Sequence, residues 1–228
     1  MASLCVITGT KREAACLVGR PADDAPEILC SGARTDHARA LLKEVLEHGC
    51  RGVVSFGLAG GLSSDLKSGM IIVPEEVSDP SGAVWRVTPG VRERFLDALH
   101  DNQLQAVGGS LCGSDRPALS PEDKFRLRET TQAIAIDMES HIVAAMASER
   151  GLPWLVVRAI ADDAGTGLPR LALDAIRQDG AVSARQMAAG ILKRPYEIPA
   201  LITLGRRSAP GLRALRRVAP LFLGGHLF

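Results

Sequence analysis

The sequence predicts an α/β protein in which one central sheet lies between two layers of helices. Short runs rich in β-branched residues alternate along the chain with segments of helical periodicity, a pattern typical of a sheet covered by helices on both faces. The central runs, residues 52–56 and 154–160, are almost wholly apolar. Strands that are buried on both faces have this composition.

The strands are predicted from apolar and β-branched runs that are bounded by turn-forming residues. They cover residues 3–8, 52–56, 70–77, 83–87, 105–112, 133–136 and 154–160. No internal repeat or linker-like stretch interrupts this series, so one domain is expected.

The helices are predicted from their start and stop signals. Thr35 can cap a helix over residues 36–48, Thr88 precedes a proline that begins a helix to about residue 100, and Ser120 precedes another such proline. A helix over residues 138–150 is expected to end before Gly151. Later helices are expected within residues 171–192 and in the tail.

The chain divides by charge into two parts. Its 228 residues are enough for one domain that encloses a pocket, and 46% hydrophobic and 23% charged residues are globular proportions. We predict a main domain over residues 1–192 and a basic helical extension over residues 193–228. The extension holds one acid, Glu197, and the basic residues Lys193, Arg194, Arg206, Arg207, Arg213, Arg216 and Arg217.

The first residues and the cysteines indicate the compartment. The chain starts with a predicted strand, without the basic and apolar segments of a secretory signal, and it has no apolar stretch near the ~18 residues that cross a bilayer. We therefore expect a cytoplasmic protein. The five cysteines lack metal-ligand or redox spacing and are expected to be buried thiols, so no metal site is predicted; they are Cys5, Cys16, Cys30, Cys50 and Cys112.

Ligands of such folds bind beyond the carboxyl ends of the strands, where loops and helix starts converge. That rule selects residues 9–13, 57–62, 137–140 and 161–164. The glycines of segment 57–62 allow close approach of the backbone to a ligand and direct N–H groups at an oxygen-rich group. The same segment is equally compatible with a tight turn.

Two acidic residues, Asp137 and Glu139, lie at the junction between the strand predicted over residues 133–136 and the next helix. Asp137 is suited to cap that helix, with Ser140 at the third helical position. Glu139 is suited to a different role, because a carboxylate can accept hydrogen bonds from the two adjacent hydroxyls of a ribose. Such bonds strengthen as positive charge develops at the anomeric carbon.

Arg158 lies late in an apolar strand, and two acids, Asp162 and Asp163, follow it. A buried arginine needs a partner, since an unpaired charge in the interior is strongly unfavourable. A structural ion pair would satisfy that need. Alternatively, an acid at the end of the strand can give a proton to a leaving nitrogen base if its surroundings raise its pKa.

Four runs together resemble a known family. Residues 57–62, 68–73, 136–140 and 156–162 occur in the order and approximate spacing of the nucleoside phosphorylase and methylthioadenosine/adenosylhomocysteine nucleosidase superfamily. The resemblance covers roughly residues 3–190. It implies a phosphorylase/hydrolase-like fold with a mixed, mostly parallel sheet, and a catalytic role for the domain over residues 1–192.

A narrower resemblance lies at the start of the tail. Leu168 with Pro169, followed by the segment over residues 192–201, is similar to the hopanoid-associated phosphorylase subfamily. That subfamily is linked to the removal of adenine from adenosylhopane.

The superfamily resemblance implies roles at the base and at the sugar. Asp162 is expected to protonate the purine at N7. Glu139 is expected to hold the ribose hydroxyls, with Met138 packed beside the sugar. Arg158 is expected to support either Asp162 or the ribosyl end of the site.

The resemblance places the nucleophile near Gly9. Glu13 approximately matches a carboxylate that activates water in the hydrolases, although the family register falls one residue later, on Ala14. Phosphorolytic relatives have an arginine near this turn, and Arg12 and Arg34 are the candidate phosphate ligands here. Water and phosphate are both possible attacking groups, and phosphate is the expected co-substrate.

Three departures from the family bear on the substrate. Leu58 stands where a small hydroxyl residue is usual, in the same segment as Gly60, and both are expected beside the substrate. Segment 79–87 is shorter than in the nucleosidases, and segment 113–117 lacks an aromatic residue that often stacks on the base. A missing wall could admit a large group at the 5′ end of the sugar.

We therefore expect an enzyme that removes adenine from adenosylhopane by phosphorolysis during hopanoid side-chain synthesis. The alternatives are a hydrolytic methylthioadenosine/adenosylhomocysteine nucleosidase and a non-catalytic protein that binds a nucleoside or a lipid-linked nucleoside. No metal or organic cofactor is expected. The acidic body, and a basic tail without interleaved aromatics, argue against a nucleic-acid partner; a homo-oligomer is expected by resemblance.

The tail over residues 205–228 allows two interpretations. It can lie in an anionic membrane interface, which would make the protein peripheral to the inner face of the membrane, or it can pack as an amphipathic helix on the body or on a partner subunit. Both use the same pattern of apolar residues with flanking arginines. The apolar residues are Leu212, Leu215, Val218, Leu221, Phe222 and Leu223, and the arginines are Arg213, Arg216 and Arg217.

Overall fold

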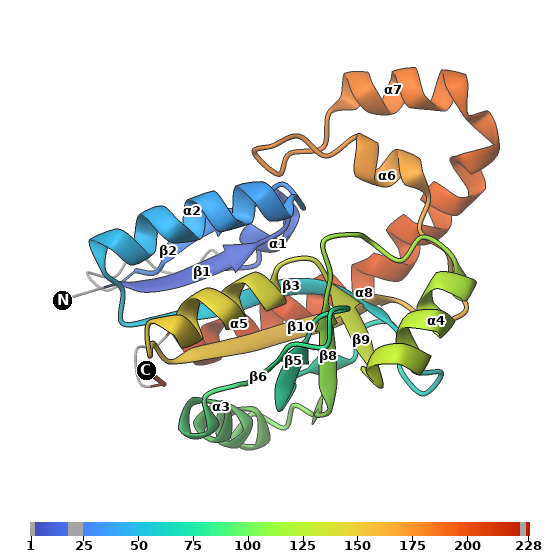
Figure 1. Cartoon of the computed structure of the whole chain (residues 1–228). Coiled ribbons are helices and arrows are strands. Elements are labelled where there is room, and N and C mark those ends of the chain that lie inside the picture. The colour runs from blue at the N-terminus through green and yellow to red at the C-terminus, as the bar shows by residue number, and fades with distance from the viewer. Residues whose placement is uncertain (1–2, 18–24, 224–226) are drawn as a thin grey trace.

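The computed structural model describes residues 3–17, 25–223 and 227–228, and it contains one sheet packed between helices (Figure 1). The strands are β1 (Leu4–Thr8), β2 (Glu27–Cys30), β3 (Gly52–Gly61), β4 (Ile71–Ile72), β5 (Glu76–Ser78), β6 (Val84–Arg86), β7 (Ala106–Val107), β8 (Ser110–Gly113), β9 (Ala135–Asp137) and β10 (Trp154–Asp162). The helices are α1 (Lys11–Ala14), α2 (Thr35–His48), α3 (Pro89–Asp101), α4 (Pro121–Thr131), α5 (Ser140–Glu149), α6 (Arg170–Asp174), α7 (Ala184–Lys193), the 3₁₀ helix η1 (Pro195–Glu197) and α8 (Ile198–Leu223).

The sheet is mixed and mostly parallel, as predicted, and β3 is its centre. β3 pairs in parallel with β1 over residues 52–55 and with β10 over residues 53–60, and its last two residues pair antiparallel with β9. The other parallel pairs are β1–β2, β4–β7, β5–β8 and β8–β9, and the other antiparallel pairs are β4–β10 and β5–β6. The parallel arrangement brings the carboxyl ends of β1, β3 and β10 to the same edge.

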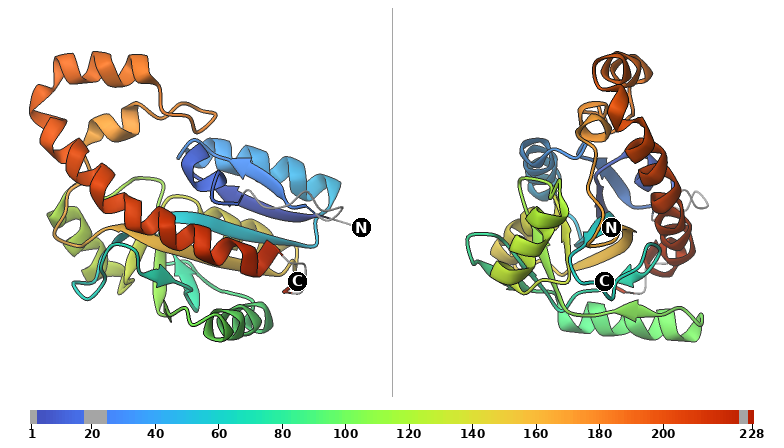
Figure 2. Two further views of the ribbon diagram at one scale, coloured as in Figure 1. Left: turned by 180° about the vertical axis from the view of Figure 1, so that it is seen from behind. Right: turned by 90° about the vertical axis from the view of Figure 1, so that its right-hand side faces the viewer.

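Helices cover both faces of this sheet, which confirms the three-layer prediction. α2 and α5 contact each other on one face, and α8 crosses the opposite face over β3 and β10 (Figures 1 and 2). Every residue of β1 and β10 is buried. Burial on both faces explains why these strands lack the alternation of apolar and polar residues that a half-exposed strand has.

Two predicted strands are each divided in the structure. The strand predicted over residues 70–77 is interrupted at Pro74 between β4 and β5, since proline has no N–H to donate to a ladder. The strand predicted over residues 105–112 is interrupted between β7 and β8 at Gly108 and Gly109. Gly109 has φ 116°, which an L side chain rarely adopts.

The glycine-rich segment 57–62 is mainly strand, so the interpretation of this segment as a tight turn was wrong. β3 continues to Gly61 because β10 also continues beyond its predicted end and pairs with it, from Gly57 opposite Arg158 to Gly60 opposite Asp162. Glycines allow β10 side chains to lie close to the β3 backbone. The short elements β2 and α1, of four residues each, were not predicted from the pattern.

The second half of α8 is an integral part of the core. Leu215, Val218 and Phe222 are fully buried, and the Phe222 ring lies 5.4 Å from that of Phe56 and 6.0 Å from that of Phe95. The partly buried residues Leu212, Leu221 and Leu223 also pack against this core. Of the two interpretations of the tail, packing on the body therefore accounts for its apolar residues, whereas Arg213, Arg216 and Arg217 remain exposed.

The first half of α8 belongs to an arm that stands away from the sheet. α6, α7 and η1 connect β10 to α8 and project beyond the body (Figure 1). Leu192 at the end of α7 is 85% exposed and Tyr196 in η1 is 74% exposed. Among the described residues, no helix has the length and apolar character needed to cross a membrane.

The buried aromatic contact of α8 can be tested by substitution. Phe222→Ala should lower the free energy of unfolding by about 3–5 kcal/mol, because it removes a fully buried ring from a packed core. Urea unfolding followed by circular dichroism measures this. The matched control is Phe125→Ala, since Phe125 is 68% exposed on α4; it should change the free energy by less than about 0.5 kcal/mol. Equal effects would contradict the packing of α8.

Candidate active site

A cavity of about 430 Å³ opens where the carboxyl ends of β1, β3, β9 and β10 meet. Its sheet side carries polar and charged groups, namely Thr10, Arg12, Glu13, Lys124, Glu139 and Asp162. Its other wall comes from the arm and α8 and is apolar, with Leu173, Ile176, Met187, Leu201, Leu204 and Leu212 among its residues. A pocket with a few convergent polar groups and an apolar wall is typical of a small-molecule site.

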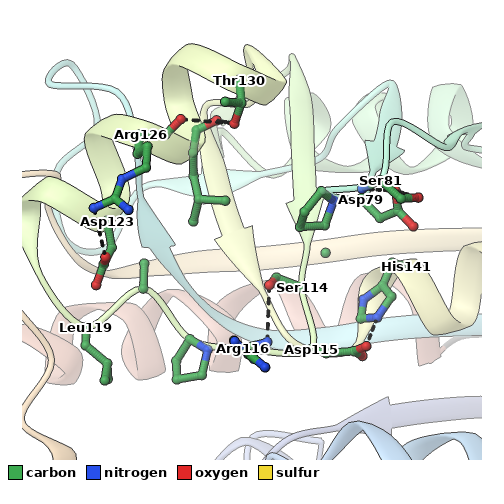
Figure 3. Close-up of a pocket in the computed structure, with 15 residues that line it drawn as sticks. Asp79, Ser81, Ser114, Asp115, Arg116, Leu119, Asp123, Arg126, Thr130 and His141 are labelled. Carbon is green, nitrogen blue, oxygen red and sulfur yellow. Dashed lines mark hydrogen bonds and ion pairs between the residues drawn. The ribbon is translucent and has the colours of Figure 1, made fainter.

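A second hollow, of about 660 Å³, lies beyond the loop that follows β8 (Figure 3). Its side chains carry charges of both signs, including the ion pair between His141 Nε2 and Asp115 Oδ1 at 3.1 Å. It shares only Pro117 and Ala118 with the first cavity. None of the site residues predicted from the sequence lines it.

Glu13 is held rigidly at the start of the chain's first helix. Thr10 caps α1, and the Glu13 carboxylate returns a capping-box contact by accepting from the Thr10 N–H at 2.6 Å and the Thr10 hydroxyl at 2.8 Å. Its other oxygen accepts from the N–H of Leu58 at 2.7 Å. These contacts fix the carboxylate between β1 and β3.

The carboxylate of Glu139 faces the same point as that of Glu13. A Cβ added to Gly9 would lie 3.1 Å from Glu139 Oε1 and 3.2 Å from Glu13 Oε2. A side chain at this position would therefore be in tight contact with both carboxylates. The Glu139 carboxylate also accepts from the Ser31 hydroxyl at 3.0 Å and from Arg158 Nη2 at 3.4 Å.

Burial raises the pKa of Glu139 to about 7. The positive charge of Arg158 opposes this rise in pKa, and the negative charges of Asp137 and Glu13 add to it. Near neutral pH, Glu139 therefore exists in both charged and neutral forms. Its ionised form is the one that can accept two hydrogen bonds from vicinal hydroxyls.

Arg158 is completely buried and lies behind Glu139. Its Nη2 is 2.5 Å from Asp137 Oδ2 and donates to the Ser55 hydroxyl at 2.6 Å. Asp137 also accepts from the backbone N–H of Ser140 at 3.1 Å. The prediction that Asp137 is the N-cap was wrong: α5 begins at Ser140 rather than at residue 138, and Glu139 is at the N-cap position. Asp137 instead combines its hydrogen bond from Ser140 with the ion pair to Arg158.

Asp162 lies at the other end of the polar side, next to Lys124. The Lys124 ammonium donates to Asp162 Oδ2 and to the Asp163 carbonyl, the latter at 2.7 Å. Burial raises the pKa of Asp162, and the positive charge of Lys124 opposes that rise. A carboxyl group whose pKa is raised by burial can hold a proton for donation.

Asp163 connects the end of β10 to α8. Its carboxylate is 2.6 Å from Arg207 Nη1 and accepts from the Thr166 hydroxyl at 2.5 Å. The hydrogen bond from Thr166 and the charge of Arg207 lower the pKa of Asp163. The pKa values of the two adjacent acids are therefore shifted in opposite directions, that of Asp163 downward and that of Asp162 upward.

Comparison with protein families gives a match over most of the chain. The family model described as the phosphorylase superfamily matches residues 3–194. The chain belongs to the phosphorylase superfamily. This confirms the superfamily predicted from the sequence motifs.

Individual relatives within the phosphorylase superfamily are distant. A curated 5′-methylthioadenosine/S-adenosylhomocysteine nucleosidase of Tolumonas auensis is 26% identical over 135 residues, which cover 51% of this chain and 59% of that relative. The chain thus spans less than two thirds of the length of that relative.

Solved structures of the superfamily share the fold. A 5′-methylthioadenosine/S-adenosylhomocysteine nucleosidase of Helicobacter pylori superimposes with a TM-score of 0.65 at 17% identity, and the match covers 85% of this chain and 98% of that one. A futalosine hydrolase of Helicobacter pylori gives a TM-score of 0.64 at 17% identity over the same shares. The nucleosidase of Neisseria meningitidis gives 0.65 at 20% identity, over 85% and 99%.

The structure brings most of the site residues that were predicted from the sequence to one cavity. Besides Asp162, Glu13, Glu139 and Arg12, the lining includes the predicted residues Gly9, Leu58, Gly60 and Met138. Arg158 is behind the lining and contacts Glu139, so it lies at the sugar end predicted for Glu139 rather than beside Asp162.

The two candidate phosphate ligands differ in position. Arg12 is exposed and lines the cavity. Arg34 does not line it, because its guanidinium turns toward Asp36, 3.1 Å away, and the side chain is 55% exposed. Among the described residues that line the cavity, Arg12 is the only arginine, and it lies near the acidic end.

Three contributors to the site were missed in the sequence. Ser31 and Ser55 are buried hydroxyls that contact Glu139 and Arg158, and nothing in the local pattern distinguishes them from ordinary serines. Lys124, in contrast, has a feature in the sequence by which it could have been identified. It is a cation in the first turns of α4, where the helix dipole disfavours positive charge.

The raised pKa of Glu139 predicts how stability depends on pH. The folded state binds this proton more tightly than the unfolded chain, so the free energy of unfolding should fall as pH rises from about 4.5 to about 7. Glu139→Gln should abolish this decrease. The free energy of unfolding at pH 8 minus that at pH 5 should therefore be higher in Glu139→Gln than in the wild type, by on the order of 1–3 kcal/mol. Urea unfolding at both pH values measures it.

The control for this prediction is Glu129→Gln, at an exposed position on α4. It should leave the wild-type difference between pH 5 and pH 8 unchanged. If Glu139→Gln behaves in the same way as this control, the Glu139 carboxyl does not titrate as described.

Proposed function

We propose that the protein cleaves the N-glycosidic bond of a purine nucleoside whose sugar carries a large apolar group. The observation that carries this proposal is the separation of acids within one cavity, with Glu13 and Glu139 beside Gly9 and Asp162 with Lys124 beside Gly60. Membership of the phosphorylase superfamily and likeness to named nucleosidases support it.

Glu139 and Asp162 have different roles in the proposed reaction. Ionised Glu139 binds the vicinal ribose hydroxyls, and these hydrogen bonds strengthen as the sugar gains oxocarbenium character. Protonated Asp162 donates its proton to N7 of the purine while the electrons of the C–N bond move to the base. Met138, which lines the same cavity, packs beside the sugar.

Water is the attacking group that the local charge favours. Two carboxylates, Glu13 and Glu139, face the space beside Gly9, and a phosphate dianion there would be repelled by both. Glu13 can instead accept a proton from a water that attacks the anomeric carbon. Hydrolysis is thus preferred to the phosphorolysis expected from the sequence.

Phosphorolysis is the second candidate because Arg12 lines the cavity close to Glu13. A guanidinium can hold phosphate oxygens in a bidentate manner. The two reactions are separated by the dependence of product formation on phosphate.

The apolar wall supports a lipid-linked substrate. Leucine, isoleucine and methionine side chains of the arm and α8 line the side of the cavity opposite the sheet. Adenosylhopane, the substrate implied by the segments around residues 168–169 and 192–201, has adenosine joined at its 5′ end to such an apolar group. A hydrophobic substituent on this wall would be removed from water, at about 0.8 kcal/mol for each buried CH₂.

The function is tested by adenine release from adenosines with 5′-alkylthio groups of one to ten carbons. The kcat/KM should rise with chain length by at least about tenfold from the shortest to the longest, since each buried CH₂ adds binding free energy. Efficient cleavage of methylthioadenosine alone would favour a methylthioadenosine nucleosidase. Tight binding of every member without adenine release would identify a binding protein.

The attacking group is tested in phosphate-free buffer. Hydrolysis predicts that the free sugar forms at the same rate without phosphate and with about 10 mM phosphate, a concentration above the usual range of KM values. Glu13→Gln should lower kcat by about 10² or more, since it removes the proposed base. A sugar 1-phosphate that forms only when phosphate is added would establish phosphorolysis instead.

The role of Asp162 is tested by Asp162→Asn. Turnover of the nucleoside should fall by about 10² to 10⁴, the usual contribution of a positioned acid. Asp163→Asn is the control at the adjacent acid and should have a smaller effect, because Asp163 is held by Arg207 and Thr166. Wild-type turnover in Asp162→Asn would remove Asp162 from this role.

Membrane contact by the tail, as expected for a lipid-linked substrate, would use the outer face of α8. Arg206, Arg213 and Arg217 are exposed there, and α8 contains no acidic residue. Such a stripe attracts anionic lipid. Co-sedimentation of the protein with phosphatidylglycerol vesicles should fall when these arginines are replaced by glutamine. Co-sedimentation with phosphatidylcholine vesicles should be weak. If the glutamine variant pellets with phosphatidylglycerol vesicles as the wild type does, this face of α8 does not bind the membrane.

A further inference from the structure

Lys124 is a charged residue in a place that helix stability does not explain. It follows the capping box formed by Ser120 and Asp123 at the start of α4, where the helix dipole favours acids. Its side chain is 1% exposed. Removal of an ammonium from water is strongly unfavourable unless a partner compensates for the lost hydration.

The partner is the acid of the proposed reaction. The Lys124 ammonium donates to Asp162 Oδ2, and a second hydrogen bond to the Asp163 carbonyl at 2.7 Å ties it to the end of β10. Within the described residues, no hydrogen bond involves Asp162 Oδ1. That oxygen is left for the substrate, and Lys124 also lines the cavity.

The neighbouring charges leave this pair intact. Asp163 lies next to Asp162, but its carboxylate is engaged by Arg207 at 2.6 Å and by Thr166. The charges that act on Asp162 are those of Lys124 on α4, Asp163 after β10 and Arg207 on α8. Lys124 is the one that hydrogen-bonds to it directly.

We propose that Lys124 is the positioning residue of the leaving-group acid: its ammonium orients Asp162 toward the base and stabilises the carboxylate left after proton transfer. This rests on the proposed function, because it takes Asp162 as the donor. The proton moves from Asp162 to N7 of the purine as the C–N bonding electrons move to the base. Lys124 keeps its own protons throughout, so the pair changes from neutral acid and ammonium to carboxylate and ammonium.

The test compares two leaving groups. Adenine must be protonated to leave easily, whereas p-nitrophenolate leaves as an anion, so a p-nitrophenyl riboside with the same 5′-alkylthio group does not need the acid. Lys124→Met should lower kcat/KM for adenine release about 10- to 100-fold at pH 7 and that for p-nitrophenolate release less than about threefold. Lys124→Arg keeps the charge and should retain most of the activity on both substrates.

The pH profile gives a second readout that a purely structural role would not change. The active form of Asp162 is protonated, so adenine release should decline at high pH as Asp162 loses its proton. Loss of the ammonium raises the pKa of Asp162, and the alkaline limb of kcat/KM should move upward by about one pH unit or more in Lys124→Met. Lys43→Met, at an exposed position on α2, is the control and should leave the profile unchanged.

Three results test the role of Lys124 separately from the proposed function. Wild-type adenine release by Lys124→Met, or an equal loss on both substrates with an unshifted pH limb, would overturn the role of Lys124. If Asp162→Asn lowers adenine release and Lys124→Met does not, the proposed function stands and only this inference fails. In the double variant, Lys124→Met should add no further loss to that of Asp162→Asn, because it acts through the same group.

Discussion

The burial of Arg158 is the constraint on which the sheet and the site both depend. A guanidinium at 0% exposure must be surrounded by acceptors, and Asp137, Glu139 and Ser55 supply them from β9, the start of α5 and β3. Even the backbone adapts, since a Cβ at Gly57 would lie 2.5 Å from Arg158 Nη1. Replacement of Arg158 would leave Asp137 and Glu139 buried without their cation, which is far less favourable than loss of a surface ion pair.

This cluster also sets the charge at the end of the cavity beside Gly9. One guanidinium faces Asp137 and Glu139, and Glu13 adds another carboxylate beside Gly9. The excess of negative charge and the burial together raise the pKa of Glu139 to about 7, with burial as the larger cause. The same excess disfavours a phosphate there. At the other end of the cavity, the Lys124 ammonium donates to Asp162, and burial raises the pKa of that acid.

The C-terminal helix contributes to both the core and the cavity. Its second half fills the core through Phe222, and its first half, with Leu201 and Leu204, forms part of the apolar wall of the cavity. The ion pair between Arg207 and Asp163 connects α8 to the loop after Asp162. A change in α8 can therefore alter both the stability of the core and the position of the loop after β10.

The sequence by itself determined the layers, the central strands and the main acids, because apolar runs, helix caps and the motifs around Glu139 and Asp162 are local patterns. It did not determine that residues 57–61 continue β3, since that depends on the ladder with β10. Only the tertiary structure decided that the tail's apolar face packs in the core, that Arg34 points away from the cavity, and that Lys124 meets Asp162 across 38 residues of chain. Contacts between distant segments depend on how the elements pack, and no local spacing records that.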